Sequence, residues 1–291
     1  MYIKTIINLI ILAIITPSSF ASEDIKDEFE GIEFENLLTS TRLKTSQKDA
    51  PASISIVTAE DIERFRYRNI PEALKSVPGF FVAESHTSYD HFLVGYHGGN
   101  ANVPRRTNLI IDGISYYQSG YSRVNWEQLP ISMSNISRIE VIRGPAASLY
   151  GSNSFTSVIN IISKKPKETL GGLNNKGVSL NARAGEPGIR DFDMSYTSGI
   201  DNFYYRLTFR HIHDDGFDIT SDGKNRHDSL WVNQFDFNGT YTLSDTSELD
   251  FSLGHSNKSQ QEQFIVSFQT GFADYDQDAI KGSLKYSNDI S

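Results

Sequence analysis

The sequence contains no cysteine, three methionines and two tryptophans, and it has fewer basic than acidic residues. Without cysteine there are no disulfide bonds, thiolate metal sites or catalytic thiols, so any core is held by packing alone. The 36 acidic and 27 basic residues give a formal charge of −9, which argues against nucleic acid as a partner. Glycine-rich phosphate loops, His-Glu-x-x-His helices and nucleophile elbows are also missing. We therefore expect a protein that is not an enzyme and that has no catalytic residue, metal ligand or cofactor.

The first 21 residues have the composition of an export signal. Lys4 precedes an apolar run from Ile6 to Ile15, and the small residues Ser19 and Ala21 follow it. This pattern predicts a secretory signal peptide over residues 1–21, cleaved after Ala21. The alternative is an N-terminal membrane anchor, but the run is shorter than the roughly 18 residues that a spanning helix needs. After it we expect no helical membrane span, and the 12% aromatic content favours an all-β or α+β protein.

The segment from Arg138 to Ser163 tells most about the chain, because two apolar, strand-like runs flank a turn of small residues. The first run is Arg-Ile-Glu-Val-Ile-Arg-Gly-Pro and the second is Val-Ile-Asn-Ile-Ile, with Leu-Tyr-Gly between them. The β-branched residues favour strands, and Gly144-Pro145 favours a turn. With the upstream strand that leads into Asp112-Gly113, these spaced pieces resemble the plug domain of TonB-dependent outer-membrane receptors.

Two helices are expected before this segment. A half-buried strand from Ala52 to Val57 leads to Thr58, which is a typical N-cap followed by acidic residues in the first helical turn. The second helix is expected from Ile70 to Val77, with Pro71 at its first position and Pro78-Gly79 after its end. Both segments resemble the opening of the plug in these receptors. The resemblance implies an α+β plug domain over residues 47–166.

Residues 22–46 form a polar, acid-rich segment between the signal peptide and the plug. Such a composition predicts a flexible N-terminal segment that does not order on its own. A short apolar patch within it could instead add as a strand to the sheet edge of a partner. In the family a TonB box does this just before the plug. The resemblance places this box at Glu35, Asn36, Leu37, Leu38, Thr39, Ser40 and Thr41.

From residue 167 to residue 291, apolar and polar residues alternate with a period of two. In the run from Phe203 to Arg210, one face carries Phe203, Tyr205, Leu207 and Phe209, and the other carries Arg206, Thr208 and Arg210. The same alternation at 178–184, 192–199, 235–243, 248–254 and 280–286 predicts about six antiparallel strands. A soluble sandwich would also show this alternation. Strand lengths near 10 residues and the aromatic residues on the apolar face favour transmembrane strands.

The connections between these strands are expected to alternate between short turns and longer loops. Short turns are expected at 201–202 and 244–247, and long polar loops at 214–230 and 257–277, although the connection at 185–190 is shorter than this scheme suggests. Receptors with a plugged lumen have about 22 strands, so about six strands make an incomplete outer-membrane β-barrel. We therefore expect the chain to be the front part of a longer receptor.

Candidate ligand-binding residues lie in the stretches that should face outward. Histidine and tyrosine bind metal, haem or iron chelates, and aromatic side chains offer surface to a ligand. The candidates are His86, Tyr89, His91, Tyr96, His97, Tyr116, Tyr117, Tyr121 and Trp126. The histidines could equally be ordinary surface residues, and the aromatic residues that follow Gly113 could belong to the plug core. The resemblance further implies plug–barrel contacts for Arg138, Glu140 and Arg143, whose buried charges need partners.

The resemblance implies a receptor in the outer membrane of a Gram-negative bacterium. Its function would be the energised uptake of a scarce solute, a small molecule or metal chelate such as a ferric siderophore, haem or cobalamin. The implied partners are TonB, acting with ExbB and ExbD, and the lipids of the outer membrane. Two alternatives stay open: an exported, plug-like ligand-binding module with a soluble sheet, or a non-functional truncated remnant whose open strand edges aggregate.

Overall fold

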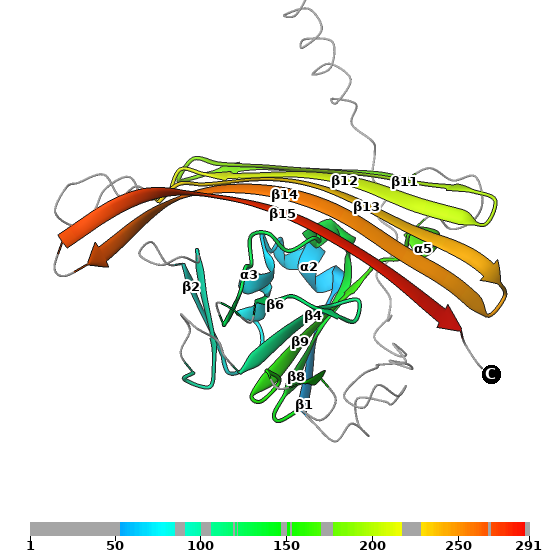
Figure 1. The fold of residues 1–291 in the computed structure, drawn as a ribbon, viewed down its shortest axis with the longest axis horizontal. Helices are drawn as coiled ribbons and strands as arrows, with labels where there is room; N and C mark the ends of the chain where they lie inside the picture. Colours follow the sequence, from blue (N-terminus) through cyan, green and yellow to red (C-terminus); the bar gives the residue numbers. More distant parts are fainter. Residues whose placement is uncertain are drawn as a thin grey trace, which may run out of the picture.

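The computed structural model of the chain describes residues 53–84, 91–99, 106–118, 120, 122–146, 150–151, 153–169, 177–216, 228–266 and 269–288. For residues 262–266 and 269–273 the description covers the backbone alone. Within these residues a plug lies against the inner, concave side of a curved six-stranded sheet (Figure 1). None of the helices in the described parts is long and apolar enough to cross a bilayer. The predicted signal peptide, the acid-rich leader and the TonB box lie outside the described residues.

A five-stranded sheet forms the centre of the plug, in the order β1-β8-β9-β4-β5. Its strands are β1 (Ser53–Thr58), β8 (Ile136–Arg143), β9 (Ser157–Ser163), β4 (Thr107–Ile111) and β5 (Ile114–Ser115). The pair β4 and β9 is parallel and the other pairs are antiparallel. The two runs of the informative segment are β8 and β9, which pair directly, with Val141 opposite Ile159.

The two plug helices begin where their capping residues predict. Thr58 caps α2 (Ala59–Phe65), because its hydroxyl accepts from the Asp61 N–H at 3.1 Å while the Asp61 carboxylate accepts from the Thr58 N–H at 3.0 Å. Asn69 caps α3 (Ile70–Leu74) through the Glu72 N–H at 2.8 Å, with a proline in the first turn. The helix α3 ends at Leu74, earlier than the sequence predicts.

The plug core lies between its sheet and its helices. Side chains with no measurable exposure include Leu74 of α3, Leu109 of β4, Ile139 of β8 and Ile161 of β9. Burying each such side chain stabilises the folded plug by roughly 1.5–3 kcal/mol. The described strands and helices together supply one continuous apolar core. Two short hairpins, a 3-10 helix and a short helix complete the plug: β2 (Phe80–Glu84) with β3 (Phe92–Tyr96), β6 (Tyr117–Gln118) with β7 (Arg123–Val124), η1 (Met133–Asn135) and α5 (Pro166–Thr169).

The second sheet is an antiparallel meander in chain order, with β10 and β15 at its two edges. Its strands are β10 (Gly177–Gly185), β11 (Ile189–Ile200), β12 (Phe203–Asp214), β13 (Leu230–Ser244), β14 (Ser247–Val266) and β15 (Gln269–Asn288). The sheet is therefore open over the described residues, as the prediction of an incomplete barrel requires. Below, this six-stranded sheet is called the wall.

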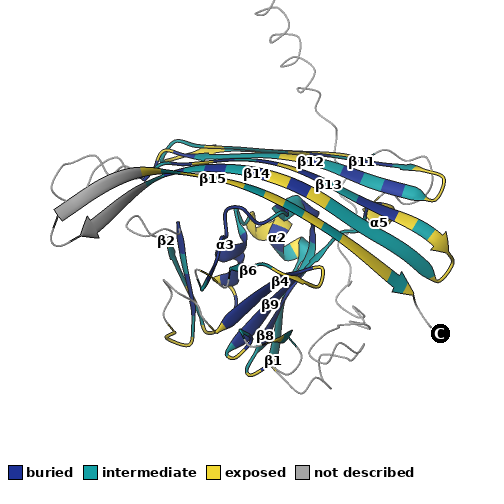
Figure 2. Cartoon of the chain, in the orientation of Figure 1, coloured by how far each residue is buried: buried dark blue, intermediate teal, exposed yellow. Residues whose placement is uncertain are grey.

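The wall buries its polar face and exposes its apolar face, which is the reverse of a soluble sheet. Figure 2 shows buried and exposed residues interspersed along the wall strands. On β12 the side chains of Arg206 and Thr208 are 2% and 1% exposed and point toward the plug, whereas Phe209 is 43% exposed on the other side. On β15 the outward Leu284 is 72% exposed. The alternation predicted from the sequence is confirmed in its period. Its apolar side faces away from the protein, as in transmembrane strands.

One predicted loop is wrong. Residues 257–277 were expected to be a long polar connection, but β14 and β15 pair from Ser247–Asn288 up to Val266–Gln269 and leave only residues 267–268 between them. The connection from β12 to β13 is long, as predicted, and the turns at 201–202 and 245–246 are short. The wall thus has its longer connection and its extended hairpin at one end, and its short turns at the other (Figure 1).

Candidate functional site: the interface between plug and wall

The plug contacts the wall through a chain of polar and charged side chains. The contacts begin at the end of the wall that carries the long connection, called here the outer end, and continue to the end with short turns, called the inner end. They bring together residues that lie more than a hundred positions apart in the sequence, such as Arg68 and Asp191. We describe the contacts in that order.

At the outer end, Arg68 links the plug to two wall strands. It follows α2, and its guanidinium donates to Asp191 of β11 at 2.7 and 3.0 Å and to Asp214 of β12 at 2.6 Å. All three side chains are largely buried, with exposures of 13%, 16% and 7%. Burial lowers the pKa of Arg68, but the hydrogen bonds and charges of the two carboxylates outweigh it and raise the pKa above the ordinary value. Arg68 is therefore a fixed positive charge held by two negative ones.

Further along, the segment Asn125–Ile131 makes the densest set of contacts with the wall. Its central residue is Glu127, whose carboxylate accepts from the Lys258 ammonium of β14 at 3.1 Å, with side-chain exposures of only 2% and 1%. Burial would raise the pKa of Glu127, but the charges of Lys258 and His91 outweigh burial and lower it. Glu127 is thus held ionised inside the interface.

The wall also donates to backbone carbonyls of the same segment. Arg210 of β12 donates to the carbonyls of Ile131 at 3.0 Å and of Glu127 at 2.8 Å. Lys281 of β15 donates to the carbonyl of Gln128 at 2.7 Å, and the Gln128 amide in turn donates to the carbonyl of Gln277 at 3.0 Å. Charged donors form stronger hydrogen bonds than neutral ones, so the segment is fixed from three wall strands at once.

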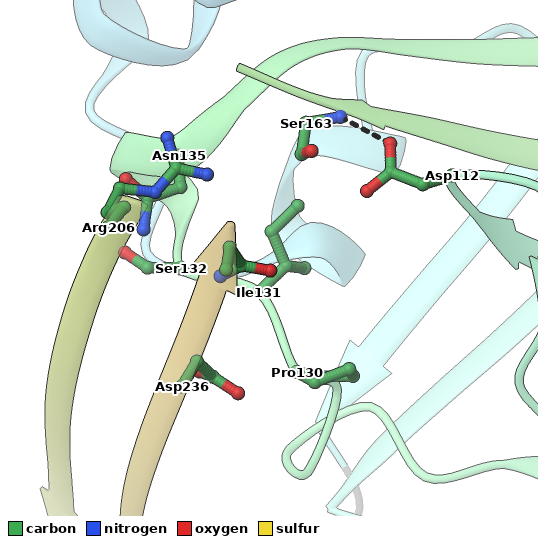
Figure 3. A pocket seen from close by; sticks show the side chains of 9 residues that line it. Asp112, Pro130, Ile131, Ser132, Asn135, Ser163, Arg206 and Asp236 are labelled. Atoms are coloured by element: carbon green, nitrogen blue, oxygen red, sulfur yellow. Dashed lines mark hydrogen bonds between the residues drawn. The ribbon is translucent and has the colours of Figure 1, made fainter. Parts of the chain in front are cut away.

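In the middle of the interface the contacts are mostly uncharged. Asn135 of η1 donates to Thr208 at 2.9 Å and to Ser195 at 3.3 Å, and Ser134 donates to Asp193 at 2.8 Å. Beside them is a small polar pocket lined by Asp112, Pro130, Ile131, Ser132, Asn135, Ser163, Arg206, Asp236 and Asn238. Figure 3 shows Arg206 and Asp236 on neighbouring wall strands, facing plug residues from two loops. Asp112 closes the plug side by accepting from the Ser163 N–H at 2.9 Å.

At the inner end the ion pairs are more exposed. Glu248, at the start of β14, accepts from Lys165 at 2.7 Å and from Lys167 at 3.3 Å. The lysine side chains are 41% and 44% exposed, and the carboxylate is 21% exposed. Exposed pairs contribute about 0–1 kcal/mol, so the inner end is held more weakly than the buried pair of Glu127 and Lys258.

The histidine and tyrosine candidates divide between the interior and the surface. His91 is buried at 3% exposure and contacts the edge of Phe92, so it does not present a free outward surface. Tyr96 and His97 lie at the base of the β2–β3 hairpin with their ring centres 4.3 Å apart. A side chain at Gly79, where φ is +88°, would meet both rings at 2.9 Å. His86, Tyr89 and Tyr121 lie outside the described residues.

The aromatic candidates after Gly113 take part in packing. Trp126 is 5% exposed within the plug core, and Tyr117 packs against that core. Tyr116 also packs there, and its ring lies 4.8 Å from the Lys281 ammonium of the wall. Burial and the charges of Asp112 and Asp236 raise the pKa of Tyr116 to about 12. The core interpretation left open by the sequence fits the described residues of this group.

The described contacts of Arg138 and Glu140 lie within the plug, and the plug–barrel contacts expected of Arg138, Glu140 and Arg143 stay a prediction. Arg138 donates to Glu140 at 2.7 Å, and Glu140 accepts from Asn160 at 3.0 Å, so these charges pair inside the plug sheet. Positions 138 and 140 share one face of β8, which brings the side chains together without help from the wall. Arg143 is half-buried and lies opposite Ser53 and Ser157. The described contacts with the wall include those of Arg68 and of the segment Asn125–Ile131.

Sequence reasoning missed these interface residues. Arg68 and Glu127 carry no motif, and their partners come from strands far along the chain. A usable signal existed on the wall strands, where Arg206, Arg210 and Lys258 occupy positions on the inner face, opposite the face that carries most of the aromatic residues. Because such charges require partners, they predict an opposing polar surface. Among the described residues, no group of three or more histidine, aspartate or glutamate side chains is placed to hold a metal ion.

Comparison with known proteins decides which family this plug represents. Residues 46–158 match the model of the TonB-dependent receptor plug domain. The chain therefore contains a plug domain of the kind found in TonB-dependent receptors. The chain is 37% identical over 131 residues to the iron-regulated outer membrane virulence protein of Vibrio cholerae serotype O1, in both the strain ATCC 39541 and the strain ATCC 39315. This match covers 43% of the chain and 19% of the length of each relative.

Solved structures show the same fold at low identity. The alcaligin outer membrane receptor of Bordetella pertussis has a TM-score of 0.61 at 18% identity, over 87% of this chain and 39% of that one. The ferripyoverdine receptor of Pseudomonas aeruginosa has a TM-score of 0.60 at 20% identity, over 78% of this chain and 28% of that one. The chain therefore has the fold of a plug domain followed by antiparallel wall strands of an outer-membrane barrel.

Proposed function

We propose that this chain is the plug and first wall of a transporter that takes up a ferric siderophore across the outer membrane. The observation that carries the proposal is that buried ion pairs hold the plug against the inner face of the wall. A transporter of this kind needs such a plug, which blocks the barrel until it moves. The structural neighbours named for alcaligin and ferripyoverdine support iron chelates as the ligand class. Haem and cobalamin are the alternatives that an experiment must separate.

We place the outer end of the wall, with its longer connection, on the outside of the cell, since barrels of this type have short turns on the periplasmic side. Plug residues that face that end would then meet the ligand, and Tyr96 and His97 stay among the candidates. TonB, energised by ExbB and ExbD, would engage the segment Glu35–Thr41 from the periplasm by strand addition. The weaker inner pairs of Lys165 and Lys167 with Glu248 lie on the side from which such a pull would come.

Uptake and binding need separate measurements to test this function. Cells that produce the receptor are given radioactive iron as a siderophore complex, as haem or as the free salt, or radiolabelled cobalamin, with and without TonB. The proposal expects one iron chelate to bind in both strains and to enter only the strain with TonB. Uptake that is unaffected by loss of TonB, or binding of cobalamin alone, would contradict it.

A proline in the proposed box tests the partner. Leu38→Pro removes a backbone donor that strand addition needs, so uptake should be lost while ligand binding is kept. Asp27→Pro, in the same segment but outside the box, serves as the matched control and should transport normally. Normal uptake by the Leu38→Pro receptor would show that the box lies elsewhere.

A further inference from the structure

The guanidinium of Arg206, on the inner face of the wall, is buried without pairing. The residue is 2% exposed, and its Nε and Nη1 atoms have no hydrogen-bond partner among the described residues. Arg210 and Lys258 lie on the same face, and each donates to the plug. A buried charge without a partner destabilises a fold. The unpaired state of Arg206 therefore points to a role that the resting contacts do not show.

Arg206 lines the small polar pocket between plug and wall, together with Asp112 of the plug and Asp236 of β13 (Figure 3). The cavity has a volume of about 20 Å³, which is room for one water molecule. A water there can bridge the guanidinium to either carboxylate, and both carboxylate charges act on Arg206 across the gap. Replacing such a bridge by direct contact shortens the separation by one hydrogen-bond length, about 3 Å. A small movement therefore suffices to pair Arg206.

The wall carboxylate of Asp236 is turned away from Arg206. The two are diagonal neighbours on β12 and β13, which is within reach of an arginine side chain. One oxygen of Asp236 accepts from Gln234 at 2.6 Å, and the other lies over Gly254 of β14, on the side away from β12. A side chain at Gly254 would meet that second oxygen at 2.5 Å. The glycine thus makes the space that keeps Asp236 from pairing with Arg206.

Asp112 is the carboxylate that the plug brings to the same pocket. It begins the two-residue turn from β4 to β5, with φ of +50° at Asp112 and +90° at Gly113. Asp-Gly suits a tight turn of this kind, so Asp112 moves with the plug sheet rather than alone. Its carboxylate is held in the resting plug by the neutral N–H of Ser163 at 2.9 Å. A guanidinium is a stronger donor than a neutral N–H, so exchanging Ser163 for Arg206 would favour the new contact.

We propose that Arg206 is a reserved partner of Asp112: the two are apart in the resting receptor and pair directly when the plug shifts against the wall during transport. The new pair expels the water from the cavity and stabilises the shifted plug. Arg206 is then a positioning residue of the moved plug, whereas Lys258 holds the resting one through Glu127. The inference rests on the proposed function, because the shift is driven by the energised pull on the plug.

Two neutral variants separate the resting state from transport. Arg206→Gln removes the reserved charge, and Asp112→Asn keeps both the turn and an acceptor for Ser163. Urea unfolding of the purified receptor reports the resting state, and cells are given radioactive iron as its alcaligin or pyoverdine complex. We expect Arg206→Gln to unfold at the same urea midpoint as the unsubstituted receptor or a higher one, while its uptake falls about tenfold, the factor that one charged hydrogen bond supplies. Asp112→Asn should lose as much uptake, and the double variant no more than either.

Gly254→Ala tests whether Asp236 has to be kept away. The added methyl group displaces the Asp236 carboxylate from its place over β14, so that it occupies Arg206 in the resting receptor. Uptake should fall while binding of the iron complex to cells without TonB is unchanged. Ser163→Ala is the matched control, because it alters the lining of the pocket but keeps the N–H that Asp112 uses. It should transport normally.

Several results would overturn the proposal. A urea midpoint of Arg206→Gln well below that of the unsubstituted receptor would mean that Arg206 is already paired at rest. Normal uptake by Arg206→Gln, Asp112→Asn or Gly254→Ala would show that no reserved pair is needed, and losses that add in the double variant would show that the two residues act separately. Uptake by the unsubstituted receptor that does not depend on TonB would contradict the proposed function instead, and the unfolding comparison would still decide whether Arg206 is unpaired.

Discussion

Replacing Lys258 with methionine should release the plug from the wall more than any change of an exposed lysine. The substitution keeps the length of the side chain but removes the ammonium that lies 3.1 Å from the Glu127 carboxylate. Both side chains are at most 2% exposed, so the carboxylate would remain buried without its partner. Breaking a buried pair in this way costs about 3–5 kcal/mol. The matched change Lys167→Met, in a pair with a lysine that is 44% exposed, should cost about 0–1 kcal/mol.

Trp126 provides the readout, because it precedes Glu127 and is 5% exposed. In a receptor with Trp231→Phe, purified in detergent, its fluorescence reports release of this segment during urea unfolding. With a slope of about 2 kcal/mol per M, the Lys258→Met midpoint should fall by roughly 2 M. A double variant with Glu127→Leu should recover most of that loss, because it leaves no unpaired charge. Equal midpoints for Lys258→Met and Lys167→Met would refute the reasoning.

The pH dependence supplies a second check. The pKa of Glu127 is lowered in the folded receptor, so its pair contributes stability that is fully present above the ordinary value of 4.5. That stability is lost as the pH falls through the lowered folded value. In Lys258→Met the carboxyl is buried without its main partner, which raises its pKa, so acid should stabilise this variant relative to neutral pH. A parallel fall of both midpoints with pH would contradict this assignment.

Three further predictions concern other contacts. Arg68→Gln should lower the urea midpoint by the equivalent of about 3 kcal/mol. Arg68→Lys should lower it less, because a lysine keeps the charge but loses the bidentate contact with Asp191. Equal losses would show that the charge is irrelevant. Thr58→Ala should cost about 1 kcal/mol by removal of the α2 cap, measured by the same unfolding, and Thr58→Ser should restore it. Leu253→Arg, on the exposed apolar face of the wall, should cost about 2–4 kcal/mol and reduce the heat-resistant folded form on gels, whereas Ser259→Arg, nearer the outer end, should leave it unchanged.

Much of the fold followed from local patterns. Thr58 and Asn69 cap their helices with their own side chains, so the helix starts are visible in the sequence. The faces of β12 were predictable because Arg206 and Thr208 alternate with aromatic residues there. The extension of β14 and β15 was not, because both faces of these strands are polar there. The period-two signal then disappears although the backbone pairing continues.

The interface was predictable only in outline. Charges on the inner face of the wall predict that a polar surface lies opposite them. Which plug residue pairs with each charge depends on how the plug docks. Glu127 and Lys258 are 131 positions apart, and nothing local to either one selects the other. Arg138 and Glu140 show the opposite case, since two positions on one strand face pair by themselves. Their expected contacts with the barrel stay a prediction.

The apolar outer face and polar inner face of the wall have a consequence for how the unfolded chain is exported. Because every second residue of a strand is polar, the lipid-facing surface exists only after the strands have paired. Before pairing, the aromatic side chains are diluted along the backbone, and the mean hydropathy of the whole chain is −0.37. A segment of this kind contains no continuous hydrophobic stretch that the export machinery would retain in the inner membrane. The same alternation that builds the wall thus lets its unfolded precursor pass through water to the membrane where it assembles.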